Sequence, residues 1–224
     1  MRFKSGEMEV VVRTHSASII CAAAALIWCG PAFGGILYSN LGPAGNVHST
    51  FTFDGVFGSS TGSGYIALAW IFTPVVSGVD AQIDLGLGYL SGTNSVTVEL
   101  LTSSKTEFGE VPGTEMESWT ANNLPNYGTC CDLVTLHGTS SLTAGMQYWL
   151  AVLPGANDTQ VAWLINTTGV STPGAVNGSS VWSPWPPGLT SGAFDIADTT
   201  GAPEPATYVL TAGALAIFAR LRRR

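Results

Sequence analysis

The sequence predicts an all-β protein: a single β-sandwich or jelly-roll-like domain, flanked by an N-terminal signal-peptide helix and a C-terminal transmembrane-like helix. Two observations predict the sandwich. No stretch between Gly35 and Ala202 shows sustained 3.6-residue periodicity, and short β-branched and aromatic runs separated by Gly, Pro, Asn and Ser fill that region instead. A parallel α/β sheet would need intervening helices, so these short strands favour packed antiparallel sheets.

Six apolar runs predict the clearest strands. In Ser95–Thr102 apolar residues alternate with Thr97 and Glu99, which is the pattern of a half-buried strand. In Gln147–Leu153 both faces are largely apolar, so we expect this strand to be covered on both sides. The six runs are Tyr65–Thr73, Val79–Leu87, Ser95–Thr102, Asp132–His137, Gln147–Leu153 and Gln160–Asn166.

Turn-forming residues lie between these runs. We expect turns at Ser91–Asn94, Val111–Gly113, Thr143–Gly145 and Pro154–Asp158, where Gly, Pro and Asn gather. Two longer segments predict irregular loops because they are rich in Gly and Ser or in Pro: Gly58–Gly64 and Trp182–Ser191.

Residues 1–34 have the order of a secretory signal peptide. Basic residues precede the apolar run Ser18–Trp28, and small residues follow it, which places the cut between Gly34 and Gly35. The apolar run is about half of the ~20 residues that a spanning helix needs, so an export signal is favoured over a membrane anchor. The domain then covers residues 35–202.

The last residues, 203–224, predict a membrane segment. The apolar run Ala206–Ala219 is followed by a basic cluster, which is typical of a stop-transfer signal with its charged end in the cytoplasm. A buried amphipathic helix is disfavoured because the run has no polar face and charged arginines are rarely buried. The cluster consists of Arg220, Arg222, Arg223 and Arg224.

The charge of the central domain excludes one class of partner. Between residues 35 and 202 there is one basic residue, Lys105, against twelve aspartates and glutamates, hence a net charge of −11. A surface almost without cations cannot gain affinity by neutralising phosphates, so nucleic acid is excluded as a partner. High net charge suits a protein that must stay soluble outside the cell.

The C-terminus resembles a known sorting signal. The tripeptide Pro203, Glu204, Pro205, then the apolar run, then the arginine cluster, stand in the order of the PEP-CTERM tail. The resemblance implies export by a Gram-negative bacterium and processing by an exosortase, a membrane enzyme that cuts near the tripeptide. The protein would be anchored in the inner membrane in transit, and then lie at the cell surface or outside the cell.

A series of short segments follows one order along the central domain: Tyr38–Gly42, Leu85–Tyr89, Ser91–Val98, Pro112–Gly113 ahead of Glu117–Trp119, and Leu142–Gly145 with Tyr148–Leu150. In that order they resemble a second family, the choice-of-anchor R proteins, which are extracellular β-domains found with alternative anchoring tails. This resemblance implies no established activity.

The residues around each apparent catalytic motif are not those that its chemistry requires. The segment Gly58–Gly62 has the letters G-x-S-x-G, but a nucleophile elbow needs a helix after the serine, and a strand is predicted there. His48 and His137 have no metal-ligand spacing. We therefore predict no enzyme activity, no cofactor and no metal site, although loop carboxylates make calcium more plausible than zinc.

Cys130 and Cys131 are adjacent, and export favours oxidation. Their Cα atoms are ~3.8 Å apart across a trans peptide, below the usual ~4.4–6.8 Å of a disulfide. A vicinal disulfide, two free thiols and an intermolecular bridge all stay open.

Two tryptophans lie among prolines: Trp182 and Trp185. Exposed loop aromatics can stack on sugar rings, whereas the alternative is that both fold back over an edge of the core. We predict a non-catalytic structural or adhesive protein of the cell envelope or matrix. The alternatives are an exopolysaccharide-binding module in which these tryptophans contact glycan and, less favoured, a secreted hydrolase or an ice-binding protein.

Overall fold

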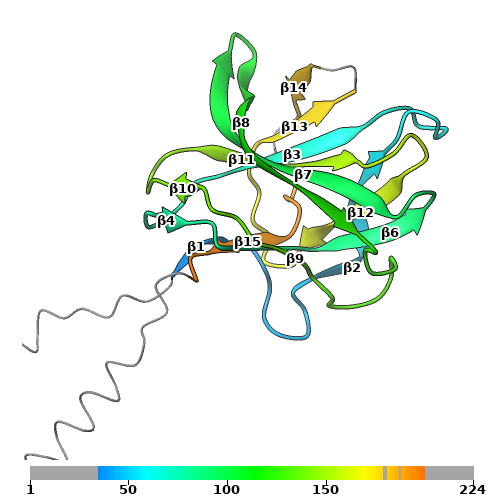
Figure 1. Cartoon of the computed structure of the whole chain (residues 1–224), viewed down its shortest axis with the longest axis horizontal. Coiled ribbons are helices and arrows are strands. Elements are labelled where there is room, and N and C mark those ends of the chain that lie inside the picture. The colour runs from blue at the N-terminus through cyan, green and yellow to red at the C-terminus, as the bar shows by residue number, and fades with distance from the viewer. Residues whose placement is uncertain (1–34, 179–180, 187, 200–224) are drawn as a thin grey trace, which may run out of the picture. The chain divides into compact units, whose positions relative to one another are not determined.

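The computed structural model describes residues 35–178, 181–186 and 188–199. Every regular element in these ranges is a strand (Figure 1), so the all-β prediction is confirmed. The predicted helices at 1–34 and 203–224 lie outside the described residues. Within the described part of the chain no helix is long and apolar enough to span a bilayer.

One layer is a six-stranded antiparallel sheet, called sheet C here, with the order β14-β13-β3-β11-β7-β8. Its two longest strands, β7 and β8, form a hairpin. The outer half of this hairpin, from Ser103 to Pro112, extends beyond the other strands (Figure 1), and we call it the arm. The strands are β3 (Ala67–Phe72), β7 (Ser95–Thr106), β8 (Gly109–Asn122), β11 (Tyr148–Pro154), β13 (Gly174–Asn177) and β14 (Trp182–Pro184).

The second layer consists of two smaller antiparallel sheets, β1-β15-β5-β9 and β2-β12-β6. Backbone hydrogen bonds join them where Gly86 N donates to Ala193 O and Leu164 N donates to Gly86 O. A short pair, β4 (Gly78–Val79) with β10 (Ser141–Leu142), closes one end. The strands are β1 (Ile36–Ser39), β2 (His48–Phe57), β5 (Gln82–Leu85), β6 (Leu87–Ser91), β9 (Val134–Leu136), β12 (Gln160–Asn166) and β15 (Phe194–Ala197).

The main core lies between the two layers. Alternate residues of sheet C, such as Leu68 and Trp70, point into it and meet Trp163 and Phe194 from the second layer. The Trp163 and Phe194 rings lie 6.1 Å apart. Successive side chains of a strand point to opposite faces of the sheet, so every second residue of the central strands of sheet C faces this core. The largest fully buried side chains include Trp70, Trp149, Trp163, Phe72 and Phe194.

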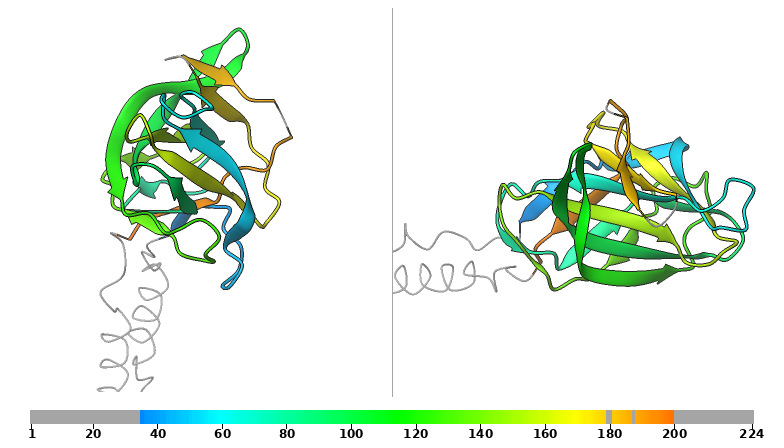
Figure 2. Two further views of the ribbon diagram at one scale, coloured as in Figure 1. Left: turned by 90° about the vertical axis from the view of Figure 1, so that its right-hand side faces the viewer. Right: turned by 90° about the horizontal axis from the view of Figure 1, so that it is seen from above.

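A second apolar cluster covers the opposite face of sheet C, with Trp149 completely buried in it. Two irregularities in the β7–β8 pairing, beside Leu101, bend the hairpin (Figure 2), and β8 reaches contact with β14 at the other edge of sheet C. Leu100 and Leu101 are consecutive and both buried, one in each cluster. The sandwich-like domain therefore includes a half-barrel, and β11 is covered on both faces.

The predicted strand Val79–Leu87 is wrong as one element. It divides into the end of β4, all of β5 and the start of β6, and β5 and β6 belong to different sheets. The chain changes sheet at Gly86, where a Cβ atom would lie 3.1 Å from the His48 ring. Apolar residues alternate with Asp80, Gln82 and Asp84 along the whole segment, so the period of two continues across the break and could not reveal it.

The predicted turn Val111–Gly113 and the predicted loop Trp182–Ser191 are also corrected. Val111–Gly113 lies inside β8, where Pro112 is accommodated because β8 is the end strand of sheet C and its pairing is irregular there. Trp182–Pro184 is strand β14, paired with β13. The turns at Ser91–Asn94, Thr143–Gly145 and Pro154–Asp158 lie between strands as predicted.

Two turn glycines allow a matched test of the fold. Gly92 and Gly145 both have positive φ, +79° and +77°, but a Cβ atom at Gly92 would overlap Asp158 O, whereas nothing lies within 4 Å of one at Gly145. Gly145→Ala should lower the free energy of unfolding by about 1 kcal/mol, the cost of left-handed backbone for alanine. Gly92→Ala should lower it clearly more, because the 154–158 turn must move. Equal losses in urea titrations would contradict the close approach.

Candidate functional site

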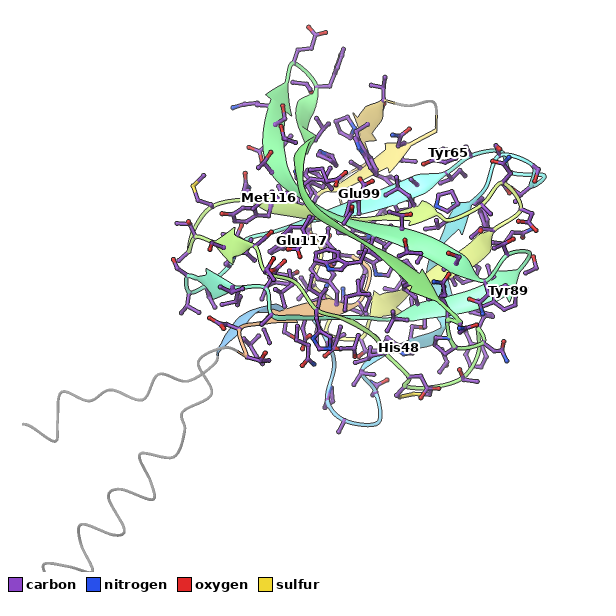
Figure 3. All side chains as sticks on the ribbon, viewed as in Figure 1. His48, Tyr65, Tyr89, Glu99, Met116 and Glu117 are labelled. Atoms are coloured by element: carbon purple, nitrogen blue, oxygen red, sulfur yellow. A yellow bond between two sulfur atoms is a disulfide. The ribbon has the colours of Figure 1, made fainter. Side chains whose placement is uncertain are left out.

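An open cleft lies at the base of the arm. Its volume is about 560 Å³, and residues of β7, β8 and the loop before β11 line it. Met116, labelled in Figure 3, lines it from β8. Most of the residues that line it carry a hydroxyl, amide or charged group, together with apolar surface such as Met116, and we call this site the arm cleft. Its polar side chains include Thr102, Ser103, Ser104, Lys105, Glu110 and Gln147.

A chain of hydrogen bonds shapes the arm cleft. Trp149 Nε1 donates to Ser103 Oγ at 3.2 Å, and Ser103 Oγ donates to Glu110 Oε2 at 3.1 Å. When the Gln147 amide is assigned with its nitrogen, in place of its oxygen, toward the same carboxylate, that nitrogen donates to Glu110 Oε1 at 3.0 Å. Since Trp149 and Gln147 belong to β11 or its approach, this chain ties the arm to the body of sheet C. Buried donors are thereby satisfied, as an indole N–H in a core requires.

Lys105 is the one lysine or arginine in the ranges that the structure describes, and it lines the arm cleft. It is exposed and stands opposite Glu110 in the β7–β8 register. The cleft therefore combines a cation, a carboxylate, an amide and several hydroxyls. Such groups can donate and accept hydrogen bonds to a polyhydroxylated or acidic ligand.

The tryptophans singled out in the sequence lie elsewhere. Trp182 is half-buried and packs on the second apolar cluster. Trp185 is half-buried as well, and its ring stacks on Trp70 with centroids 5.9 Å apart and planes 12° apart. Neither residue lines the arm cleft. The structure thus brings these two aromatic rings against the core and does not join them to the cleft.

Cys130 and Cys131 form a vicinal disulfide in the structure. They lie in the loop before β9, where Cys130 is exposed and its sulfur is 3.8 Å from Gly45 O. Neither is among the residues that line the arm cleft. The bridge therefore lies next to the β1–β2 connection.

The two histidines bind backbone carbonyls. His48 is buried, with Nδ1 3.0 Å from Ser49 O and Nε2 3.3 Å from Asp132 O. His137 is exposed, and its Nδ1 lies 3.1 Å from Ala81 O. In the described residues no group of three His, Cys, Asp or Glu side chains could hold a metal ion. Ser60, the serine of the G-x-S-x-G letters, donates to Asn157 O in a surface turn.

The strongest electrostatic feature is a carboxylate pair, Asp80 and Glu117. Asp80 is completely buried; its Oδ1 accepts from Ser140 N at 2.7 Å, and its Oδ2 has no hydrogen-bond partner. Burial and then the nearby Glu117 raise the pKa of Asp80 to about 7. Glu117 (Figure 3) accepts from backbone and hydroxyl donors of Thr139 and Ser140, and these bonds hold its pKa below the usual value despite partial burial.

Other acidic groups are packed without cationic partners. Burial raises the pKa of Asp54 to about 6, and burial followed by repulsion from Asp84, its neighbour across the sheet, does the same for Asp195. Burial and then Glu115 raise the pKa of Glu99, which is labelled with Tyr65 in Figure 3. The native state therefore binds protons at pH values where an unfolded chain would have lost them.

Asp80→Asn tests this account of the buried acid. A raised native pKa means that the contribution of Asp80 to stability is fully present below its unfolded pKa of about 3.8 and is lost as the pH rises through about 7. Between pH 5 and pH 8 the loss for the natural chain is on the order of 3 kcal/mol, because the native pKa lies about two units above pH 5 and each unit is worth ~1.4 kcal/mol. We expect Asp80→Asn to reduce the fall in unfolding free energy between pH 5 and pH 8.

The control for that comparison is Asp132→Asn, because Asp132 is exposed. Urea unfolding of both variants and the natural chain over this pH range measures the difference. An unchanged slope in Asp80→Asn would show that Asp80 does not carry the proton.

The two ends of the domain meet at one place. Asp198 N donates to Gly35 O at 2.9 Å, beside the pairing of Ile36 with Ala197 at the edge of β1 and β15. Gly35, expected to follow the signal-peptide cut, is the first described residue, whereas Gly34, Pro203, Glu204, Pro205 and the arginine cluster lie outside the described residues.

Comparison with known families, curated proteins and solved structures identifies no similar protein.

Reasoning from the sequence missed the arm cleft. The residues that line it belong to the polar end of β7 after Thr102, to β8 and to the loop that ends at Gln147. No sequence pattern indicates that these three segments lie side by side. The available signal was Lys105, which stands out as a lone cation among carboxylates. That signal excluded a class of partner but did not locate a site.

Proposed function

We propose that this chain is an exported, non-catalytic protein of the bacterial cell surface or extracellular matrix, processed at its C-terminus by an exosortase. Export and processing are inferred from the leader at 1–34 and from the ordered tail: Pro203–Pro205, the apolar run Ala206–Ala219 and the arginines after it. The domain itself acts by adhesion or by building the matrix.

The observation that supports this best is the common exit of the two chain ends. Gly35 and Asp198 are hydrogen-bonded to each other, so both terminal segments leave the domain from one edge. A folded domain attached in this way can be exported, held at the membrane by its tail, and released as a unit when the tail is cut. As part of the same proposal, the strands of the domain are connected as in a jelly roll, and residues 203–224 form a transmembrane helix.

The domain's chemistry fits a passive role outside the cell. Lys105 is the single basic residue in 35–202, and high negative charge keeps an exported protein soluble. In the described residues the two histidines bind carbonyl oxygens and are not paired with a nucleophile. A hydrolytic triad would require that pairing.

Processing of the tail can be measured by intact mass and C-terminal sequencing of the protein from the native host. We expect a C-terminus near Pro203–Pro205 with Arg220–Arg224 absent. Changing Pro203, Glu204 and Pro205 together to alanine should block the cut. Changing Thr199, Thr200 and Gly201 to alanine, in the segment just before the tripeptide, should not. An intact tail found solely in membranes would overturn the sorting half of the proposal.

A second candidate is binding of exopolysaccharide, which the arm cleft favours. Its hydroxyls, its amide and its lone cation suit a sugar chain, above all one that carries carboxylates. Lys105→Ala with Gln147→Ala should weaken binding of the producer's own polysaccharide by at least about tenfold, since hydrogen bonds to charged groups are worth ~1.5–3 kcal/mol.

The comparison variants are Glu107→Gln, exposed at the arm tip, and Trp182→Ala with Trp185→Ala. Loss of binding in the tryptophan pair alone would assign the contact to the β14 segment. If neither pair changes the binding isotherm, or if no polysaccharide binds, this candidate fails.

A further inference from the structure

Four exposed apolar side chains gather at the end of the domain from which the terminal segments leave. Ile36, Val75, Val76 and Met146 are between 47% and 75% exposed. We call them the apolar end patch. Scattered exposed apolar residues need no explanation, but a group on adjoining segments indicates a surface that meets something else.

Backbone and side-chain hydrogen bonds place the members of the patch together. Val75 N donates to Leu37 O at 2.8 Å, next to Ile36, and Gly145 N donates to Pro74 O at 3.0 Å, next to Met146. Ala144 N donates to Ser77 Oγ at 2.8 Å. The loops before β4 and after β10 therefore form one surface with the start of β1, at the side of the domain where β4, β10 and β1 are labelled in Figure 1.

The same end holds the C-terminal exit. Asp198 N is bonded to Gly35 O, and the Asp198 carboxylate accepts from Val79 N at 3.2 Å, directly after the loop that carries Val75 and Val76. From Thr199 to Ala206, where the apolar run begins, there are seven residue steps, which span at most about 25 Å. A tail inserted in a bilayer thus keeps this end of the domain near the lipid headgroups.

Charge also favours this end. The segments 74–77 and 143–146 contain no charged residue, whereas the whole domain carries twelve carboxylates and one lysine. An anionic bilayer repels carboxylates within about a Debye length, ~8–10 Å, so the uncharged segments meet less repulsion than the rest of the domain, and the charged group beside them is Asp198, whose carboxylate accepts from Val79 N.

We propose that the apolar end patch rests on the lipid bilayer while the C-terminal segment is inserted, and orients the domain on the membrane before the tail is cut. This inference rests on the proposed function, because it requires the tail to enter the membrane. Moving side chains such as valine and methionine from water to the boundary between headgroups and acyl chains is favourable. Removal of the tail then exposes the patch to water.

The test uses the full chain in vesicles of phosphatidylethanolamine with a minor fraction of phosphatidylglycerol. A fluorescent non-natural amino acid replaces Val76, or Phe108 at the arm tip as the control, since Phe108 is 78% exposed. Lipids with a spin label high on the acyl chain report contact with the bilayer, and iodide reports contact with water. We expect severalfold stronger lipid quenching, and weaker iodide quenching, at position 76 than at position 108.

A charge variant separates contact from mere proximity. Val75→Asp, in the chain labelled at position 76, should abolish the extra lipid quenching, whereas Phe108→Asp should leave it unchanged. Met146 is not substituted because it also lines the arm cleft.

Flotation of the vesicles distinguishes membrane insertion of the tail, which the proposed function requires, from contact of the apolar end patch with lipid. If the chain does not float with lipid, the membrane half of the proposed function fails, and this inference fails with it. If the chain floats but positions 76 and 108 are quenched equally, the tail inserts and the patch proposal is overturned. If position 76 is protected from iodide without lipid quenching, a second protein surface covers the patch, which also overturns the proposal.

Discussion

The structure depends on β11 having two buried faces. Leu150 and Val152 fill the main core between the layers, while Trp149 and Ala151 face the opposite side of sheet C. Leaving an indole of that size in water would forfeit roughly 1.5–3 kcal/mol of burial. The curvature of sheet C removes it from water, because the bent β7–β8 hairpin carries the arm over the outer face of the strand.

The arm cleft is a consequence of that curvature. The arm passes over Trp149, and the hydrogen bonds from Trp149 to Ser103 and from Ser103 to Glu110 hold it there. The space between its base and the approach to β11 remains open and is lined by the polar residues of the bent hairpin. A packing requirement on β11 thus creates the one cleft that the proposed ligand binding would use.

Scarcity of cations shapes the rest of the surface. Lys105 is in the arm cleft, and packed carboxylates elsewhere in the described domain, such as Asp80 and Glu117, accept hydrogen bonds from backbone N–H groups and hydroxyls in place of cations. The pKa of Asp80, raised to about 7 by burial and then by Glu117, is the clearest case. The segments around Val75 and Met146 carry no charge, and the proposal that this end approaches a bilayer rests partly on that property.

Local pattern alone determined the all-β class, the strand at Gln160–Asn166 and the turns around Gly92 and Gly145, because these depend on residues close together in the chain. It also determined the excess of carboxylates and the layout of the terminal segments, on which the export proposal rests. The double burial of Gln147–Leu153 could be anticipated as well, because both of its faces are apolar.

Tertiary structure decided what depends on distant segments. Gly86 stands where one alternating run passes from one sheet to the other, and a Cβ atom there would lie 3.1 Å from the ring of His48, a residue far away in sequence. Pro112 stays within β8 because that strand is the end strand of sheet C and itself carries the extra residue at both irregularities of the β7–β8 pairing. The arm cleft and the apolar end patch likewise bring together segments that no local pattern relates, since long-range strand pairing, not residue preference, sets which loops meet.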